Sequence, residues 1–268
     1  MSANKETIGR TILVAFLMCL FCSVIVAGAA VYFKPIQQAN KALDKRSNIL
    51  AAAGMLEAGK SVDELFKRIT TKVVNLETGE YVSEQDVATL KAAGYNPDDF
   101  NQRKSAKDPV LSRALEGDED KASIKRLEKY AAVYLLEEDG QLKRIILPVH
   151  GYGLWSTLYG FVALEGDAET IAGMGFYSHA ETPGLGGEVD NPAWKALWKG
   201  KKVHDENQQV AIRVIKGKVD PAAAKAVNEV DGLSGASLTS RGVSNLMQFW
   251  FGELGFAHYL AHLKQQGV

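Results

Sequence analysis

The residues best suited to chemistry stand together in the segment D-G-L-S-G-A-S-L-T-S, from Asp231 to Ser240. Four hydroxyl side chains and two glycines precede apolar residues at helical spacing, namely Val243, Leu246, Met247, Trp250, Phe251 and Leu254. A helix N-terminus presents unpaired N–H groups and a positive dipole end, and glycine lets the backbone approach an anion closely. The pattern predicts a phosphate-binding helix start or, as the structural alternative, an ordinary helix capped by Thr239 or Ser240.

Two more segments combine glycine with aromatic or polar residues. In His150–Trp155, two glycines bracket Tyr152 after a predicted strand, which favours a turn whose backbone lies against a flat ligand, with Tyr152 or Trp155 near its face. His179–Gly187 gathers one imidazole, one carboxylate and three glycines, and such loops bring N–H groups to a ligand. Taken singly, His150–Trp155 is better explained as an ordinary connection between strands with core aromatics. The ordinary alternative for His179–Gly187 is a mobile turn.

Composition narrows the class of protein. The chain has 268 residues, of which 46% are hydrophobic and 24% charged, as in globular proteins of one or two domains. The formal net charge of −1 gives no indication of nucleic-acid binding. The two cysteines, Cys19 and Cys22, lie in the apolar N-terminal run, and no second pair completes a metal site. They are therefore interpreted as small apolar residues of a membrane helix.

The N-terminal run from Thr11 to Phe33 contains no charged residue and is long enough to span a bilayer core, which needs about 20 residues. The alternative is a cleaved signal peptide with Lys5 and Arg10 in its basic region and a cleavage site near Ala29. Because the apolar run continues past that point, the sequence favours an uncleaved anchor. More basic residues follow the run than precede it, so the positive-inside rule leans against a C-terminus outside the cytoplasm. Long domains can cross the membrane despite flanking charge, so this count does not set the orientation.

The remaining pattern predicts an α+β fold: a mainly helical or irregular segment 34–129, with a helix starting at Ser47, and then a mostly antiparallel sheet with helices in 130–268. The predicted strands are two around a hairpin turn at Asp139–Gly140, then 158–164, 170–177 and 210–215. The predicted helices of this part are 192–198, 221–228 and the amphipathic helix that follows Ser240. The chain lacks a G-x-G-x-x-G motif and βαβ repetition, so a dinucleotide fold is not expected.

His258 and His262 stand one helical turn apart, a spacing that can bind a metal. No third ligand is evident in the sequence. We interpret them as surface histidines near a helix C-terminus, where positive charge is favourable, and expect no metal site.

The segment D-G-L-S-G-A-S resembles the flavinylation motif D-x-x-[ST]-G-A-[ST], in which a flavin transferase joins the phosphate of FMN to the last hydroxyl. That hydroxyl falls on Ser237, where the family usually has threonine, and Thr239 is the rival acceptor. G-Y-G-L-W and E-T-P-G-L-G resemble two further segments of this covalent-FMN-binding family, in the same order. The resemblance implies no catalytic residue and these cofactor-binding residues: Tyr152, Gly153, Glu181, Thr182, Gly184, Leu185, Asp231, Ser234, Gly235, Ala236, Ser237, Leu238 and Thr239.

The whole chain resembles the family of C subunits of the sodium-translocating NADH:quinone oxidoreductase. This resemblance implies covalently bound FMN and a six-subunit complex of the bacterial inner membrane, which passes electrons from NADH to ubiquinone and moves sodium outward. The implied partners are the other subunits and a flavin transferase, with no nucleic acid. The implied domains are a cytoplasmic tail 1–10, a transmembrane helix 11–33, the segment 34–129 and a periplasmic FMN-binding domain 130–268.

Two alternatives stay open. The G subunit of the related Rnf electron-transport complex shares the motif and the anchor but is usually shorter, and the segment 36–129 favours the first family. From another functional class, a membrane-anchored module without a redox role would hold a free anion in the Ser/Gly loop. A flavin that stays on the chain after denaturation separates the two classes.

Overall fold

The computed structural model describes residues 7–266, so residues 1–6 of the predicted cytoplasmic tail lie outside the described residues. The chain divides after Asp44 into an N-terminal unit and a compact unit that begins at Lys45. Within the described residues, α1 (Ile8–Ala52) is the one helix long and apolar enough to cross a membrane. Its apolar stretch is exposed, as expected of a single-pass anchor.

The helix α1 is longer than the sequence pattern predicts. We expected an apolar helix ending at Phe33 and a separate helix from Ser47, but one 45-residue helix contains both. Pro35 lies inside it. Proline removes one backbone hydrogen bond and kinks a helix without necessarily ending it, so a proline just after the apolar run is a poor sign of a boundary.

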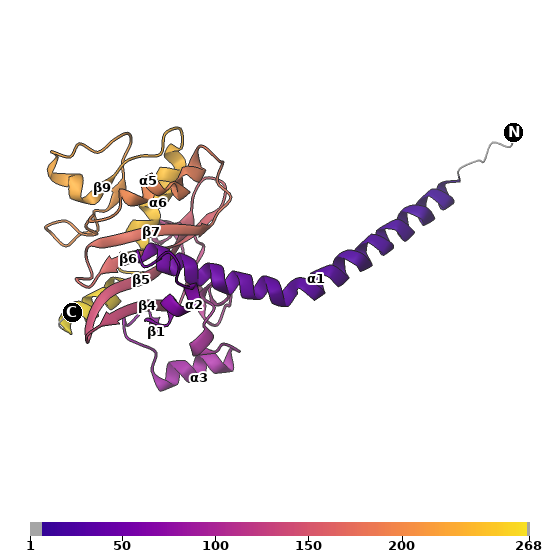
Figure 1. Ribbon diagram of the computed structural model, residues 1–268, viewed down its shortest axis with the longest axis horizontal. Coiled ribbons are helices and arrows are strands. Elements are labelled where there is room, and N and C mark those ends of the chain that lie inside the picture. Colours follow the sequence, from indigo (N-terminus) through magenta and orange to yellow (C-terminus); the bar gives the residue numbers. More distant parts are fainter. Residues whose placement is uncertain (1–6, 267–268) are drawn as a thin grey trace. The chain divides into compact units, whose positions relative to one another are not determined.

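An antiparallel sheet of five strands forms the centre of the compact unit, in the order β1-β4-β5-β6-β7 (Figure 1). Its strands are β1 (Ile69–Asn75), β4 (Tyr130–Glu138), β5 (Gln141–Tyr152), β6 (Thr157–Glu165) and β7 (Ile171–Ser178). The predicted hairpin turn joins β4 to β5, and both Asp139 and Gly140 have positive φ, as a two-residue primed turn requires. The predicted α+β architecture is confirmed.

Both faces of the sheet are buried because alternate residues of each strand point to opposite sides. One face, with Val133 and Val162, packs against the C-terminal helices α6 (Ser237–Trp250) and α7 (Ala257–Gln265). The other face, with Tyr134 and Phe161, covers Ile49 at the end of α1 and the residues that follow it. The predicted apolar stripe of α6 is buried from Val243 to Trp250, and Leu254 lies beyond the helix end.

The remaining elements are short and connect these layers. They are α2 (Val62–Phe66), α3 (Glu84–Ala92), η1 (Pro97–Asp99), α4 (Gln102–Ser105), β2 (Ser112–Ala114), η2 (Gly117–Glu119), β3 (Arg126–Glu128), η3 (Gly186–Asp190), α5 (Pro192–Ala196), β8 (Arg213–Val214), η4 (Ala224–Asn228) and β9 (Glu229–Val230).

Two predictions about these elements are wrong. The segment 221–228 is not an α-helix but holds the short 3₁₀ helix η4, in which the N–H groups of Ala226 and Glu229 donate to the carbonyls of Ala223 and Ala226. The strand β9 follows at once. The strand predicted at 210–215 is observed only over the two residues of β8, which pairs in parallel with β9.

Candidate functional site

The three glycine-containing segments meet around one buried carboxylate, that of Glu181. Its Oε1 accepts hydrogen bonds from the N–H groups of Leu154 (3.1 Å), Trp155 (2.9 Å) and Ser156 (3.3 Å), which follow β5. Its Oε2 accepts a hydrogen bond of 2.7 Å from the hydroxyl of Thr239 in the first turn of α6. The Glu181 carboxylate, in the segment His179–Gly187, therefore holds the segments His150–Trp155 and Asp231–Ser240 together.

The environment of Glu181 keeps it ionised although the residue is only 5% exposed. Burial opposes the charged form of this carboxyl. The hydrogen bonds from Thr239 and from the three backbone N–H groups outweigh that penalty, so the pKa of Glu181 lies below its usual value. These four hydrogen bonds are internal, so Glu181 holds the loops that carry the predicted flavin-binding residues.

Close backbone contacts explain several glycines of the three segments. A Cβ at Gly153 would lie 2.6 Å from Oε1 of Glu181, and a Cβ at Gly242 would lie 2.4 Å from the carbonyl oxygen of Tyr152. These contacts seat α6 directly on the end of β5. Gly242 was missed in the sequence, although an isolated glycine in an apolar helical run is a recognised sign of close packing.

Gly186 offers a test of this packing. A Cβ there would lie 2.6 Å from Oγ1 of Thr239 and 2.7 Å from Oε2 of Glu181, so Gly186→Ala is expected to break their hydrogen bond and destabilise the protein by about 3 kcal/mol. Gly184 has φ +74° and open space around its Cβ, so Gly184→Ala is expected to cost only about 1 kcal/mol through backbone strain. Chemical denaturation measures both, and equal losses would contradict this assignment.

At the start of α6, the structure separates the two candidate acceptor hydroxyls. Ser237 is the first residue of the helix and is exposed, whereas Thr239 is fully buried and donates to Glu181. The prediction that Thr239 or Ser240 caps the helix is wrong: Ala236 holds the N-cap position without a side-chain cap. The Ser240 hydroxyl instead accepts from the N–H of Leu233, which closes the loop ahead of the helix.

The first turn of α6 can accept an anion. Within the described residues, the N–H groups of Ser237, Leu238 and Thr239 have no hydrogen-bond acceptor. Unpaired N–H groups and the dipole of a 14-residue helix favour a phosphate beside the Ser237 hydroxyl. The loop before it is well held, since the carbonyl of Asp231 accepts from Trp194 Nε1 and its carboxylate from the N–H of Val219.

All three converging segments carry exposed apolar side chains. Trp155 is 66% exposed. The other members are Tyr152, Leu154, Leu185 and Leu238. A flat, mostly apolar ring has suitable contacts here, so the described residues fit FMN at both its ends, the phosphate and the ring.

The other predicted site residues lie in the same loops. Thr182 and Gly184 are exposed, and the Thr182 carbonyl accepts from the N–H groups of Leu185 and Gly187, which folds this loop on itself. Ser234 and Gly235 are also exposed, Ala236 is buried, and Gly235 has φ +73° next to the side chain of Leu185. All thirteen predicted residues therefore fall within the three converging segments.

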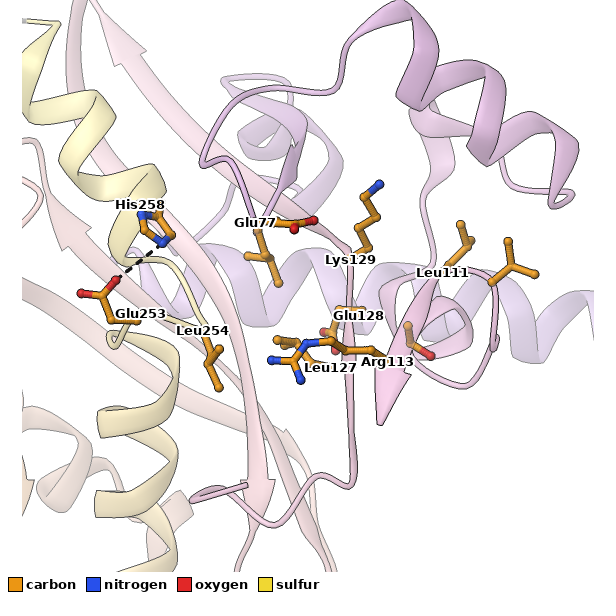
Figure 2. A pocket seen from close by; sticks show the side chains of 12 residues that line it. Glu77, Leu111, Arg113, Leu127, Glu128, Lys129, Glu253, Leu254 and His258 are labelled. Carbon is orange, nitrogen blue, oxygen red and sulfur yellow. Dashed lines mark ion pairs between the residues drawn. The ribbon is translucent and has the colours of Figure 1, made fainter. Parts of the chain in front are cut away.

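A pocket of about 460 Å³ lies elsewhere, between the β2–β3 ladder, the end of β1 and α7 (Figure 2). Its lining includes Arg113, Glu128 and Lys129 but none of the predicted flavin residues. His258 also lines it and forms an ion pair with Glu253. No group of three or more potential ligand residues in the described part of the chain is arranged to hold a metal.

Comparison with known proteins identifies the family. Residues 153–252 match the FMN-binding domain family. The chain is 57% identical over 267 residues, 98% of both chains, to the C subunit of the Na(+)-translocating NADH-quinone reductase of Pseudomonas aeruginosa. It is 44% identical over 269 residues to the C subunit of the same enzyme from Vibrio parahaemolyticus, with full coverage of both chains.

A solved structure agrees with these relatives. The crystal structure of Shewanella oneidensis NqrC superposes with a TM-score of 0.74 at 36% identity and covers 85% of this chain and 99% of that one. The predicted FMN-binding domain is thereby confirmed, and the first of the two families suggested by the motifs is the correct one. The chain belongs to the NqrC family, the C subunits of the Na(+)-translocating NADH-quinone reductase.

Proposed function

We propose that this chain is a membrane-anchored flavoprotein subunit that carries one FMN as a phosphoester on Ser237 and relays electrons within a sodium-pumping NADH:ubiquinone oxidoreductase. The attachment site is supported by one observation: Ser237 is exposed, and beside it lie three N–H groups that have no acceptor in the described chain. The similarity to the C subunits of this enzyme along nearly the whole chain supports the setting.

FMN supplies one-electron exchange, and the protein supplies position and environment. The first turn of α6 binds the phosphate through its N–H groups, and the exposed apolar side chains from Tyr152 to Leu238 contact the ring. Glu181 holds the three segments in place. A covalent bond keeps the cofactor on a domain that works outside the cytoplasm, and no residue of this chain needs to act as a general acid or base.

The proposal includes its partners. A flavin transferase attaches FMN to Ser237, and five other subunits complete the assembly in the bacterial inner membrane. The full chain produced with a flavin transferase should keep its flavin after denaturation and gel electrophoresis. Flavin that is released on denaturation would reject covalent attachment, and a chain that never binds flavin would favour the anion-binding module.

The proposed topology follows the domains suggested by the sequence: a cytoplasmic tail 1–10, the transmembrane helix 11–33, the segment 34–129 and the FMN-binding domain 130–268 in the periplasm. The apolar part of α1 supports the anchor. A reporter that is active only in the periplasm should be active when it is fused after Val268 and inactive when it is fused before Thr11. A mature N-terminus near Ala30 would show instead that the apolar run is cleaved.

A further inference from the structure

Glu181 is a buried anion without a counter-cation among the described residues. All four of its hydrogen-bond donors are neutral, being three backbone N–H groups and one hydroxyl. Within the described residues, no lysine, arginine or histidine forms an ion pair with its carboxylate. Neutral donors lower the energy of the charge but leave its net value at −1, and burial reduces the solvent screening of its field.

The arrangement of donors favours the ionised form. Three N–H groups converge on Oε1, so a proton on that oxygen would face three donors. The depressed pKa of the carboxyl agrees with this geometry. The charge is therefore a fixed feature of the folded protein near neutral pH.

The position of this charge relates it to the proposed flavin site. Oε1 lies against the backbone that carries the exposed Leu154 and Trp155, and Oε2 contacts Thr239, two residues after Ser237. We infer that Glu181 is a positioning residue that also tunes the bound flavin, because its negative charge opposes the addition of electrons there. This inference rests on the proposed attachment of FMN at Ser237.

The expected size follows from Coulomb's law. A unit charge about 10 Å away, in a medium of effective dielectric constant about 20, changes an electron-transfer equilibrium constant on the order of tenfold. A tenfold change corresponds to about 59 mV for a one-electron couple. Glu181→Gln, which removes the charge, should therefore make the flavin easier to reduce by about this amount.

Glu181→Gln is the informative variant because it keeps the shape of the side chain. Its amide oxygen can accept from the three N–H groups, and its amide nitrogen can donate to Thr239. Glu188→Gln is the matched control: it removes the same charge from the same loop, where the side chain is partly exposed and solvent screens it. Thr239→Val is the packing control, since it removes the hydroxyl and keeps the charge.

The midpoint potential of the flavin is measured in the full chain by spectroelectrochemical titration, after mass spectrometry has confirmed FMN on Ser237. The expected result is a more positive potential in Glu181→Gln, a shift less than a third as large in Glu188→Gln, and no positive shift in Thr239→Val. An unchanged potential in Glu181→Gln would overturn the inference. A folded Glu181→Gln chain that takes up no FMN would also overturn it, because the charge would then serve loading and not tuning.

A measurement on the flavin-free protein tests the charge itself. Carboxyl ¹³C NMR should show Glu181 ionised at pH 7 and protonated only below the range of an ordinary glutamate, and a protonated carboxyl at pH 7 would overturn the inference. Wild-type protein without FMN on Ser237 would overturn the proposed function first. The outcomes therefore distinguish failure of the tuning role from failure of the attachment site.

Discussion

The Ser237→Ala variant is expected to carry no covalent flavin, whereas Ser237→Thr is expected to carry as much as the wild type. Ser237 presents its hydroxyl to solvent at the first position of α6, beside N–H groups that have no acceptor in the described chain. Threonine keeps the nucleophilic oxygen and is the usual residue of the family motif. In-gel flavin fluorescence after denaturation measures both variants.

Thr239→Ala separates attachment from packing. Its hydroxyl is fully buried and already donates to Glu181 over 2.7 Å, so the alanine variant should keep the covalent flavin. Because Oε2 of Glu181 then loses the only donor that it has among the described residues, the variant should be less stable by about 1–3 kcal/mol. Loss of covalent flavin in Thr239→Ala together with its retention in Ser237→Ala would show that the acceptor is Thr239.

The second large effect concerns a buried acid on β3 and a buried base near the end of β5. Glu128 is fully buried, its Oε1 accepts from Gln102 Nε2 over 2.6 Å, and its Oε2 has no hydrogen-bond partner among the described residues. Nδ1 of His150 lies 4.0 Å from Oε1. His150 stacks on Tyr159, and the guanidinium of Arg103 lies 3.7 Å from the centre of that ring.

Burial shifts both groups toward their neutral forms. Desolvation raises the pKa of Glu128 from 4.5 to about 7, although the hydrogen bond from Gln102 acts in the other direction. Desolvation and the charge of Arg103 lower the pKa of His150 from 6.5 to about 4. At a pH between these values, folding therefore removes a proton from the His150 imidazole and adds one to the Glu128 carboxylate.

The two shifts have opposite consequences for stability. Between about pH 4.5 and 6.5 the unfolded chain holds a proton on His150 and the folded chain holds one on Glu128, so their pH dependences cancel. When one of the two side chains is replaced, the pH dependence of stability that the other contributes should become measurable. In Glu128→Gln, stability should fall by about 3 kcal/mol as the pH falls from 6.5 to 4, and in His150→Asn by about 3 kcal/mol as the pH rises from 4.5 to 7.

Chemical denaturation of the flavin-free chain in detergent across this pH range measures both slopes. Glu77→Gln, an exposed acid that also lines the pocket of Figure 2, serves as the control and should leave the wild-type profile unchanged. Slopes of the same sign in Glu128→Gln and His150→Asn would contradict the neutral pair.

Much of the fold could be read from local signals. The primed turn at Asp139–Gly140 and the apolar stripe from Val243 to Trp250 both depend on residues within a few positions of one another. The three motif segments chosen from the sequence also meet in the structure. A local sequence pattern does not tell which distant residues come into contact after folding. The hydrogen bond between Glu181 and Thr239, for example, joins residues 58 positions apart.

Two residues show what this missing information costs a prediction from sequence. Thr239 has the right type and place for a helix cap, and only its contact with Glu181 assigns it to the interior. Glu128 stands in a charged stretch between Arg126 and Lys129, yet the fold covers it completely. A single charged residue in a polar segment gives no sign that tertiary packing will bury it.

The most direct measurement is the location of the flavin in the tryptic peptide 226–241, AVNEVDGLSGASLTSR, which contains both candidate acceptors. The full chain is produced with a flavin transferase, digested and fragmented by tandem mass spectrometry. We predict that FMN is carried by the fragment ions that contain Ser237 and is absent from those that begin at Leu238. FMN on the fragment that begins at Leu238, or a peptide without FMN, would contradict the central claim.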